Sequence, residues 1–275
     1  MIILFLFWYT EVMKAVILTD NRTIIDSYYL GEPAFSLYLE CDGKKILFDT
    51  GYSDVFLRNA GKMGIDLSGL DAVVLSHGHN DHTGGLRFLT GRKLIGHPDV
   101  FEYKEDQGLS VGSPVSLKEA EERFTEVLLA KEPYRISEHL LYLGEIPRIH
   151  DFESVPVGHR IVNGQKEDDH CLDDSALVYE EEGGIFVFTG CSHSGLCNIL
   201  DRAKKLTGKT RILGILGGFH LLQKDERMKK TVDYLKGEEI DTLYPCHCIG
   251  LDALYEMMKE GLPVRECGVG TTIER

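Results

Sequence analysis

Runs of apolar residues broken by glycine- or aspartate-containing turns predict strands and short helices along the first third of the chain. Segment 34–40 alternates apolar and polar residues, and Asp42-Gly43 separates it from segment 44–51, a pattern typical of a β-hairpin. The predicted strands are 14–20, 34–40, 44–51, 71–77 and 93–97. Helices are predicted at 53–64, which ends in glycine, and from 84 to 91.

In the last third of the chain, predicted strands and helices alternate. Two strands over 175–191 meet at Gly183-Gly184, and segment 263–270 closes the chain. The strands that follow are 210–220 and 240–247, and the helices are 195–208, 226–237 and 250–261. Alternation of this kind is typical of parallel strands with helical crossovers. We therefore expect an α/β protein with two sheets packed face to face and helices outside, since this buries both apolar faces of each sheet.

Residues 98–170 are less regular than the segments on either side. A helix is predicted at 116–124, where Ser116 and Glu119 form a capping-box pattern, and 133–146 is rich in predicted strand. Because irregular insertions often carry function, we expect this region to contribute to substrate specificity within a domain spanning 13–275.

The first twelve residues form a separate N-terminal extension. Their apolar run covers Met1 to Tyr9, whereas a membrane-spanning helix needs about 20 apolar residues. The segment has neither a basic leader nor a small-residue cleavage site. It is expected to be an extension from an upstream start codon or an additional edge strand, with a membrane anchor as the less favoured alternative.

Composition narrows the classes of molecule that the protein is expected to bind. The chain has 275 residues and a net charge of −14, which argues against nucleic-acid binding because that affinity comes largely from Lys and Arg. We expect a small-molecule substrate and no stable membrane association, and the sequence does not fix the oligomeric state. The 7 cysteines form no regular framework, which favours reduced thiols and a cytoplasmic location.

The segment SHGHNDHTGG concentrates potential metal ligands directly after a predicted strand. In a loop, His77 and His79 can point to one side while Asp81 and His82 point to the other. Imidazole and carboxylate are good ligands for zinc, manganese or iron. One ion cannot easily use four such close neighbours, but two ions about 3.5–4 Å apart can. A solvated polar turn is the alternative, and it leaves this crowding unexplained.

Three later histidines each follow a predicted strand: His193, His220 and His247. Each is separated from the next by one strand–helix step. Because parallel strands in register bring their carboxyl ends to one edge of a sheet, we expect these side chains to approach one another.

Taken together, the motifs LFDTG, SHGHNDHTGG, FTGCSHSG, LGGFHL and PCHC-x-G resemble the metallo-β-lactamase superfamily from Met13 onward. Within it, the chain is most similar to the 7,8-dihydropterin-6-yl-methyl-4-(β-D-ribofuranosyl)aminobenzene 5′-phosphate synthase-like subfamily. The resemblance implies a four-layer αββα sandwich with the metal site at one edge of the two sheets.

The resemblance also implies roles for individual residues. His77, His79 and His193 match the ligands of a first metal, and Asp81, His82 and His247 match those of a second. Asp49 matches a buried carboxylate that supports the metal loop.

Five further positions leave alternatives open. His220 stands where many relatives have an aspartate bridging both metals; it is expected to bind one metal, to hydrogen-bond substrate or water, or to be structural. Asp173 and Asp174 are expected to position substrate, or else to form a solvated turn. Cys246 and Cys248 are expected to be structural, although a thiolate ligand is conceivable.

The expected function is metal-dependent hydrolysis. Two divalent ions, zinc first with manganese or iron as alternatives, would activate a hydroxide against a small anionic ester or phosphoester, with Asp81 and His220 as catalytic residues. One alternative is a transferase that joins a dihydropterin methyl carbon to a ribofuranosyl-aminobenzene phosphate. Another is a non-catalytic module that binds a metal or ligand.

Overall fold

The first sheet contains the predicted hairpin and the strand before the histidine motif. A computed structural model describes residues 13–153, 155–162 and 164–275, so the predictions for the N-terminal extension lie outside the described residues. The sheet order is β17-β1-β2-β3-β4-β5-β8. These strands are β1 (Lys14–Thr19), β2 (Ser36–Cys41), β3 (Lys44–Phe48), β4 (Ala72–Val74), β5 (Lys93–Gly96), β8 (Glu126–Leu129) and β17 (Thr272–Glu274). The hairpin prediction is confirmed, because β2 and β3 are antiparallel with Leu37 opposite Phe48.

The second sheet contains the predicted strand–helix alternation. Its order is β16-β15-β14-β13-β10-β9. These strands are β9 (Tyr134–Arg135), β10 (Leu140–Tyr142), β13 (Ala176–Glu181), β14 (Gly184–Thr189), β15 (Ile212–Gly217) and β16 (Leu243–Pro245). Strands β14, β15 and β16 are parallel neighbours, which confirms that their carboxyl ends share one edge.

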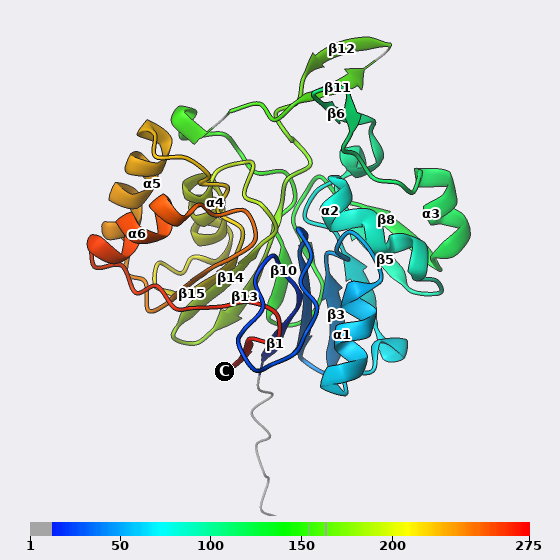
Figure 1. Cartoon of the computed structure of the whole chain (residues 1–275), viewed down its shortest axis with the longest axis horizontal. Helices are drawn as coiled ribbons and strands as arrows, with labels where there is room; N and C mark the ends of the chain where they lie inside the picture. The colour runs from blue at the N-terminus through cyan, green and yellow to red at the C-terminus, as the bar shows by residue number, and fades with distance from the viewer. Residues whose placement is uncertain (1–12, 154, 163) are drawn as a thin grey trace, which may run out of the picture.

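Helices cover the outer face of each sheet (Figure 1). On one side lie α1 (Val55–Met63) and α3 (Leu117–Arg123); on the other lie α4 (Leu196–Thr207), α5 (Glu226–Lys236) and α6 (Leu251–Lys259). Between the sheets, Phe48 of the first packs in one apolar cluster with Phe186 and Phe188 of the second. Two further clusters join each sheet to its helices. The predicted αββα sandwich is therefore confirmed.

The predicted helix from 84 to 91 is wrong in type and length. A single helical turn, α2 (Asn80–Thr83), is followed by the 3-10 helix η2 (Gly84–Phe88). A Cβ on Gly85 would lie 2.1 Å from the Thr50 carbonyl oxygen, so the chain passes too close to its neighbour for a side chain there. Glycine also weakens a regular helix, which explains the tighter, shorter element.

A small third sheet forms within residues 98–170, and the sequence pattern did not predict it. Its order is β12-β11-β6-β7, from β6 (Lys104–Asp106), β7 (Leu109–Ser110), β11 (His159–Val162) and β12 (Gln165–Asp168). Figure 1 shows it at one end of the sandwich, away from the C-terminus. The capping box at Ser116 and Glu119 is confirmed at the start of α3. Among the described residues, no helix combines the length and apolar character needed to cross a membrane.

Candidate metal centre

Loops from both sheets converge at the end of the sandwich near the small sheet. His77 and His79 follow β4 of the first sheet. His193, His220 and His247 follow β14, β15 and β16 of the second, as their spacing predicted. Residues far apart in sequence thus form two adjoining groups of possible metal ligands.

The first group consists of His77, His79 and His193. His77 Nε2 lies 3.0 Å from His79 Nδ1. The His193 ring centroid lies 4.7 Å from that of His77 and 4.8 Å from that of His79, both edge to face. His77, His79 and His193 are thus buried side by side, and three imidazoles are the ligand set of a three-coordinate protein site with room for a further ligand.

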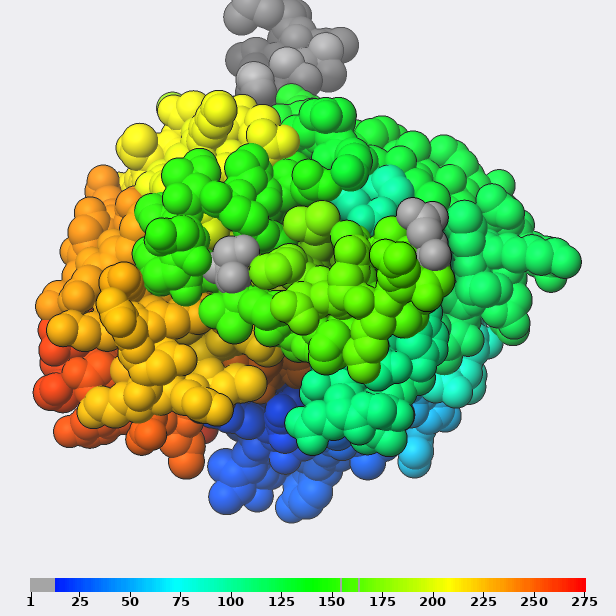
Figure 2. Space-filling model, turned by 90° about the horizontal axis from the view of Figure 1, so that it is seen from above, coloured from blue at the N-terminus to red at the C-terminus, as the bar shows by residue number. Residues whose placement is uncertain are grey.

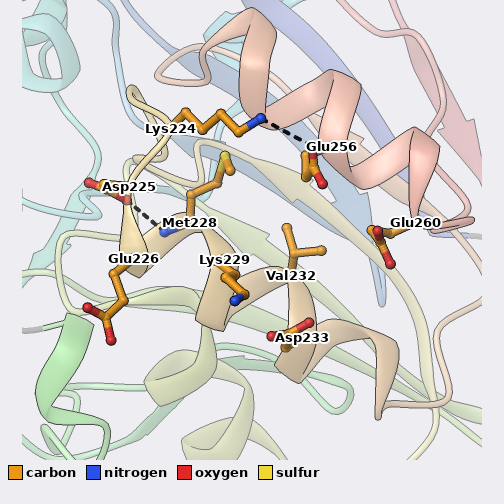
Figure 3. Close-up of a pocket in the computed structure, with 9 residues that line it drawn as sticks. All are labelled: Lys224, Asp225, Glu226, Met228, Lys229, Val232, Asp233, Glu256 and Glu260. Atoms are coloured by element: carbon orange, nitrogen blue, oxygen red, sulfur yellow. Dashed lines mark hydrogen bonds and ion pairs between the residues drawn. The ribbon is translucent and has the colours of Figure 1, made fainter.

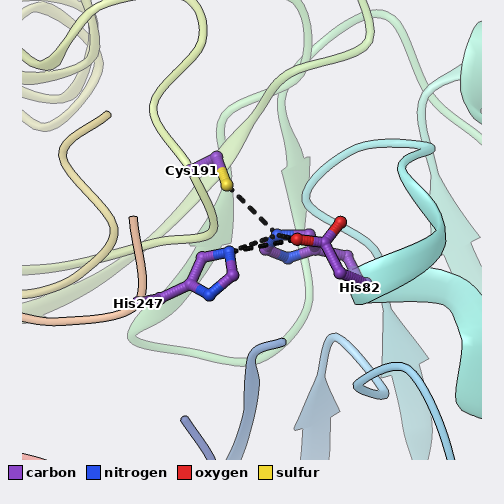
Figure 4. Close-up of side chains that lie close together, drawn as sticks. His82, Cys191 and His247 are labelled. Carbon is purple, nitrogen blue, oxygen red and sulfur yellow. Dashed lines mark hydrogen bonds and ion pairs between the residues drawn. The ribbon is translucent and has the colours of Figure 1, made fainter. Parts of the chain in front are cut away.

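The second group consists of Asp81, His82 and His247. Figure 4 shows the imidazoles of His82 and His247 pointing toward each other. His82 Nε2 lies 3.1 Å from His247 Nε2, and Asp81 Oδ2 lies 3.3 Å from His247 Nε2 and 3.6 Å from His82 Nε2. Two donors that each lie about 2.0–2.1 Å from a tetrahedral zinc ion are about 3.3 Å apart. The three separations therefore match the edges of one coordination tetrahedron.

Unpartnered imidazole nitrogens test whether this site fits metal ions. Both ring nitrogens of His193, Nε2 of His79 and Nδ1 of His220 are buried without a hydrogen-bond partner. Leaving one such group unpaired costs about 1–3 kcal/mol, so several in one place indicate that another species satisfies them. Divalent ions fit this donor set.

The protonation states of the first group also favour metal binding. Burial lowers the pKa of His77 and His193 well below the ordinary histidine value. It also lowers the pKa of His79 to about 4. These imidazoles are therefore neutral at physiological pH, which is the form that binds a metal.

The second group has the opposite electrostatics. Burial opposes a charge on His82, but the Asp81 and Asp49 carboxylates raise its pKa to about 9. The pKa of Asp81 is lowered despite its burial, because His82 and His247 stabilise the carboxylate. A positive charge is thus favoured here, and a divalent ion would take the place of the proton on His82.

Asp49 supports the loop that carries His77 to His82, as expected for the buried carboxylate. It is fully buried and accepts hydrogen bonds from Ser76 N–H at 2.7 Å, from Ser76 Oγ at 2.6 Å and from His82 Nδ1 at 2.7 Å. Bonding at Nδ1 leaves Nε2 of His82 directed at the second group. Ser76 Oγ also lies 2.9 Å from His77 Nδ1, so one carboxylate orients ligands of both groups.

Asp173 and Asp174 occupy a different place from the one predicted. Both are fully buried, and neither lines the cleft. Asp173 Oδ2 accepts the Gly78 N–H at 2.7 Å, and Asp174 Oδ2 accepts the Ser194 N–H at 2.9 Å. The predicted contact with substrate is therefore replaced by a supporting role: each aspartate fixes the backbone beside a metal-ligand candidate.

Sequence reasoning missed the partner of Asp173. Lys104 of the small sheet is 1% exposed, and its Nζ lies 3.0 Å from Asp173 Oδ1 and 2.8 Å from Asp169 Oδ2. The two aspartates raise the pKa of Lys104 against the effect of burial, so the buried amine stays charged. A single lysine in an irregular segment gave no signal of this role.

Cys191 was also missed as a member of the site. Its Sγ lies 3.2 Å from His82 Nε2. The only sequence signal was its position two residues before His193.

The backbone of His247 is held by Asp20, whose Oδ1 accepts the His247 N–H at 2.7 Å. Both His247 and His220 have positive φ angles, 54° and 47°, a strained backbone that is common at functional sites.

The two groups open into a cleft of about 670 Å³ beside the small sheet. Figure 2 shows this face, with a recess bordered by the blue N-terminal segment, the gold segment before α5 and the green small-sheet segments. The lining residues are Asn21, Pro33, Tyr52, His79, Asn80, Asp81, Asp106, Val111, Val157, Cys191, His193, His220, Leu222, His247, Cys248 and Ile249.

A second hollow, of about 470 Å³, lies between α5 and α6 (Figure 3). It is lined mainly by charged residues such as Lys224, Asp225 and Glu256, and its described lining contains no histidine or cysteine. Of these two hollows, only the first is therefore lined by residues able to bind a transition metal.

Comparisons with known proteins agree with this geometry. The family model described as "Metallo-beta-lactamase superfamily" matches residues 30–98. The chain is 34% identical over 247 residues to the uncharacterized protein MJ0448 of Methanocaldococcus jannaschii, covering 88% of this chain and 92% of that protein. It is 31% identical over 245 residues to 7,8-dihydropterin-6-methyl-4-(beta-D-ribofuranosyl)-aminobenzene-5'-phosphate synthase of the same organism, covering 82% and 83%.

A solved structure extends the similarity to the whole fold. Tm1679, described as a metal-dependent hydrolase of the beta-lactamase superfamily, superposes with a TM-score of 0.86 at 31% identity, covering 96% of this chain and 99% of that one. The resemblance drawn from the sequence motifs is therefore confirmed, and the chain belongs to the metallo-β-lactamase superfamily.

Proposed function

We propose that this protein is a metal-dependent hydrolase that cleaves a small anionic ester or phosphoester. The observation that carries the proposal is the cluster of buried histidines from both sheets, several with unpartnered ring nitrogens, beside one cleft. When bound, two divalent ions would supply Lewis acidity, which activates water and polarises an ester or phosphoryl oxygen.

Each of the two groups of side chains would bind one ion. His77, His79 and His193 hold one ion, and Asp81, His82 and His247 hold the other. Imidazole with a single carboxylate favours zinc, with iron or manganese as alternatives. Asp49 and Asp173 keep the loop that carries four of these ligands in a fixed geometry.

Two groups are placed to act on substrate. The Asp81 side chain is 27% exposed and lines the cleft, so its carboxylate can accept a proton from the attacking water. His220 also lines the cleft, and its unpartnered Nδ1 can hydrogen-bond a substrate oxygen.

The charge of the cleft supports an anionic substrate only through the ions. The described lining contains Asp81 and Asp106 but no lysine or arginine. Bound divalent ions would be the largest local charges, and they reverse the sign set by the carboxylates. Recognition of an anion is therefore expected to disappear when the metal is removed.

The test is turnover of a panel of aryl phosphodiesters, phosphomonoesters and lactones by protein loaded with zinc, iron or manganese. We expect about two ions per chain and metal-dependent hydrolysis of at least one class. His79→Ala should abolish turnover, and a variant with full activity would overturn the proposal. His150→Ala is the control, because His150 pairs with Asp201 at 2.8 Å outside the cleft and should leave turnover unchanged.

A transferase is the second candidate, because a relative at 31% identity is named as a synthase. Here the same residues would hold a pterin donor and an aminobenzene ribofuranoside phosphate for coupling. Incubating the loaded protein with both compounds distinguishes the two by product mass. A coupled product without hydrolysis of the panel would replace the hydrolase, and a protein that binds no metal would favour the non-catalytic module.

A further inference from the structure

We propose that Cys191 is a thiolate ligand of the ion held by Asp81, His82 and His247, which completes a four-residue coordination shell. This inference rests on the proposed metal centre and goes beyond it by changing the chemistry of one half of the site. Figure 4 shows the Cys191 sulfur pointing at the imidazole of His82, on the side where His247 also approaches.

Distances around the sulfur support a shared ion. One donor atom from each of Asp81, His82, Cys191 and His247 can be chosen so that all four lie within 4.8 Å of one another. The Sγ–Nε2 separation to His82 is 3.2 Å. With Zn–S of about 2.3 Å and Zn–N of about 2.0–2.1 Å, tetrahedral geometry places S and N about 3.6 Å apart. The observed separation requires only a small expansion when an ion enters.

The backbone around Cys191 directs the sulfur inward. Ser192 has a φ of 61°, and its Oγ donates a hydrogen bond to the Gly218 carbonyl oxygen at 2.6 Å. This arrangement fixes the turn after β14, so the side chains on either side of Ser192, Cys191 and His193, both reach the centre. Cys191 is 4% exposed, and water competes little for its sulfur.

A thiolate ligand would add negative charge that the neutral histidines of the site do not supply. His220 lines the cleft beside both groups, and one imidazole nitrogen cannot coordinate two ions. With an ion bound, a Cys191 thiolate would supply negative charge near both groups, since its Sγ also lies within 4.8 Å of ligand atoms of His77 and His193.

The consequence is a division of roles between the ions. A zinc ion with four protein ligands is typical of a structural or electrostatic site, whereas three ligands leave a position open for catalysis. Water activation then falls to the ion held by His77, His79 and His193. A sulfur ligand also favours zinc, iron or cobalt over manganese or magnesium at the second position.

The test uses the full-length protein loaded with Co²⁺ and, separately, with Zn²⁺. The wild type should show a thiolate-to-cobalt charge-transfer band and, by X-ray absorption, a sulfur neighbour at about 2.3 Å from zinc. Cys191→Ser should lose both signals and bind the second ion more weakly, by at least the roughly 10–100-fold that outer-shell partners cost. Its metal-free unfolding midpoint shows whether the variant has folded.

Cys248→Ser is the matched control, because its thiol lines the same cleft but, among the described residues, can share an ion only with Cys191 and His220, and not with Asp81, His82 and His247. It should keep the charge-transfer band and the sulfur neighbour. Loss of the sulfur signal in Cys248→Ser but not in Cys191→Ser would overturn the inference. Bound ions with no sulfur neighbour in the wild type would also overturn it and leave the proposed function intact, whereas a wild type without bound ions would overturn both.

Discussion

The two sheets contribute to the metal centre in different ways. The first places four ligand candidates on one loop, His77 to His82, and fixes that loop with buried side-chain acceptors, Asp49 and Asp173. The second places one histidine after each of three parallel strands. It holds them through the backbone: φ is positive at Ser192, His220 and His247, and the carboxylates here, Asp20 and Asp174, accept backbone N–H groups rather than ring nitrogens.

This contrast separates two ways of orienting ligands. Hydrogen bonds to buried carboxylates orient the first-sheet ligands, so removing an acceptor should loosen them. Close approach of glycine backbone positions the second-sheet ligands, so adding a side chain should displace them. The small sheet is a third contributor, since Lys104 anchors Asp173.

Removing Asp49 should have the largest effect, because it acts on both groups at once. Asp49→Ala leaves the Ser76 N–H and hydroxyl and the His82 Nδ1–H without their acceptor. We expect a loss of about 3–5 kcal/mol in metal-free unfolding free energy and a fall of about 10–100-fold in metal affinity. Denaturant unfolding and metal titration measure both, and Asp49→Asn should lie between wild type and Asp49→Ala. Wild-type metal affinity in Asp49→Ala would refute the bracing role.

Lys104→Met tests whether the small sheet supports the first-sheet loop. The substitution leaves Asp169 and Asp173 as buried carboxylates without a cation, which typically costs about 3–5 kcal/mol. Lys166→Met is the control on the same small sheet: Lys166 pairs with Glu105 in a solvent-exposed ion pair, whose removal should change stability little. Equal losses in the two variants, measured by denaturant unfolding, would contradict the distinction.

Gly190→Ala tests the second sheet. A Cβ at this position would lie 2.0 Å from Ser76 Oγ, which is already bonded to Asp49. We expect a loss of about 1–3 kcal/mol in unfolding free energy and weaker metal binding, because the strand would push the serine and the histidine beside it. In Gly61→Ala, on α1, the new Cβ would meet nothing within 4 Å, and the variant should gain about 0.5–1 kcal/mol. Loss of stability in both variants would point to a general glycine effect.

The smallest effect is expected at the opposite end of the sandwich, where Asp42 and His139 form an ion pair at 2.7 Å. The hydrogen bond to Asp42 raises the pKa of His139, so its contribution is complete below pH 6.5 and is lost as pH rises through the folded value. Burial favours protonated Asp42, but hydrogen bonds from His139 and Ser137 lower its pKa, so stability is also lost as pH falls below 3.8 through the folded value.

A double-mutant cycle of Asp42→Asn and His139→Ala checks this pair. The coupling should be about 0.2–1 kcal/mol between these two limits and vanish outside them, because the pair is partly exposed. A coupling that does not change with pH would mean that packing, rather than charge, links the two residues.

Much of the fold and of the ligand set could be predicted from local sequence. The hairpin at Asp42-Gly43 and the parallel order of β14, β15 and β16 follow from turn chemistry and from regular alternation. The segment from His77 to His82 is a contiguous motif, and the strand–helix spacing brings the later histidines to the same edge. Such patterns are visible because each one is repeated within a few residues or at a fixed step.

Other features depended on neighbours that the sequence pattern does not reveal. The prediction of a helix at 84–91 was wrong because Gly85 packs closely against Thr50. Strand β17 was not predicted because its three residues become a strand only beside β1. Lys104 and Asp173 are 69 residues apart, and Cys191 and His82 are 109 apart. No local periodicity marks contacts of this length.

The sequence by itself determined which chemical groups the protein offers and that its strands deliver them to one edge, because both follow from residue type and repeat. Only the tertiary structure decided that Asp173 and Asp174 brace the backbone rather than face the cleft, that Lys104 is buried between carboxylates, and that a cysteine sulfur adjoins the second ligand group. The physical reason is that burial and ligand distance are properties of the packed chain, fixed when two sheets and a small third one close around the same site.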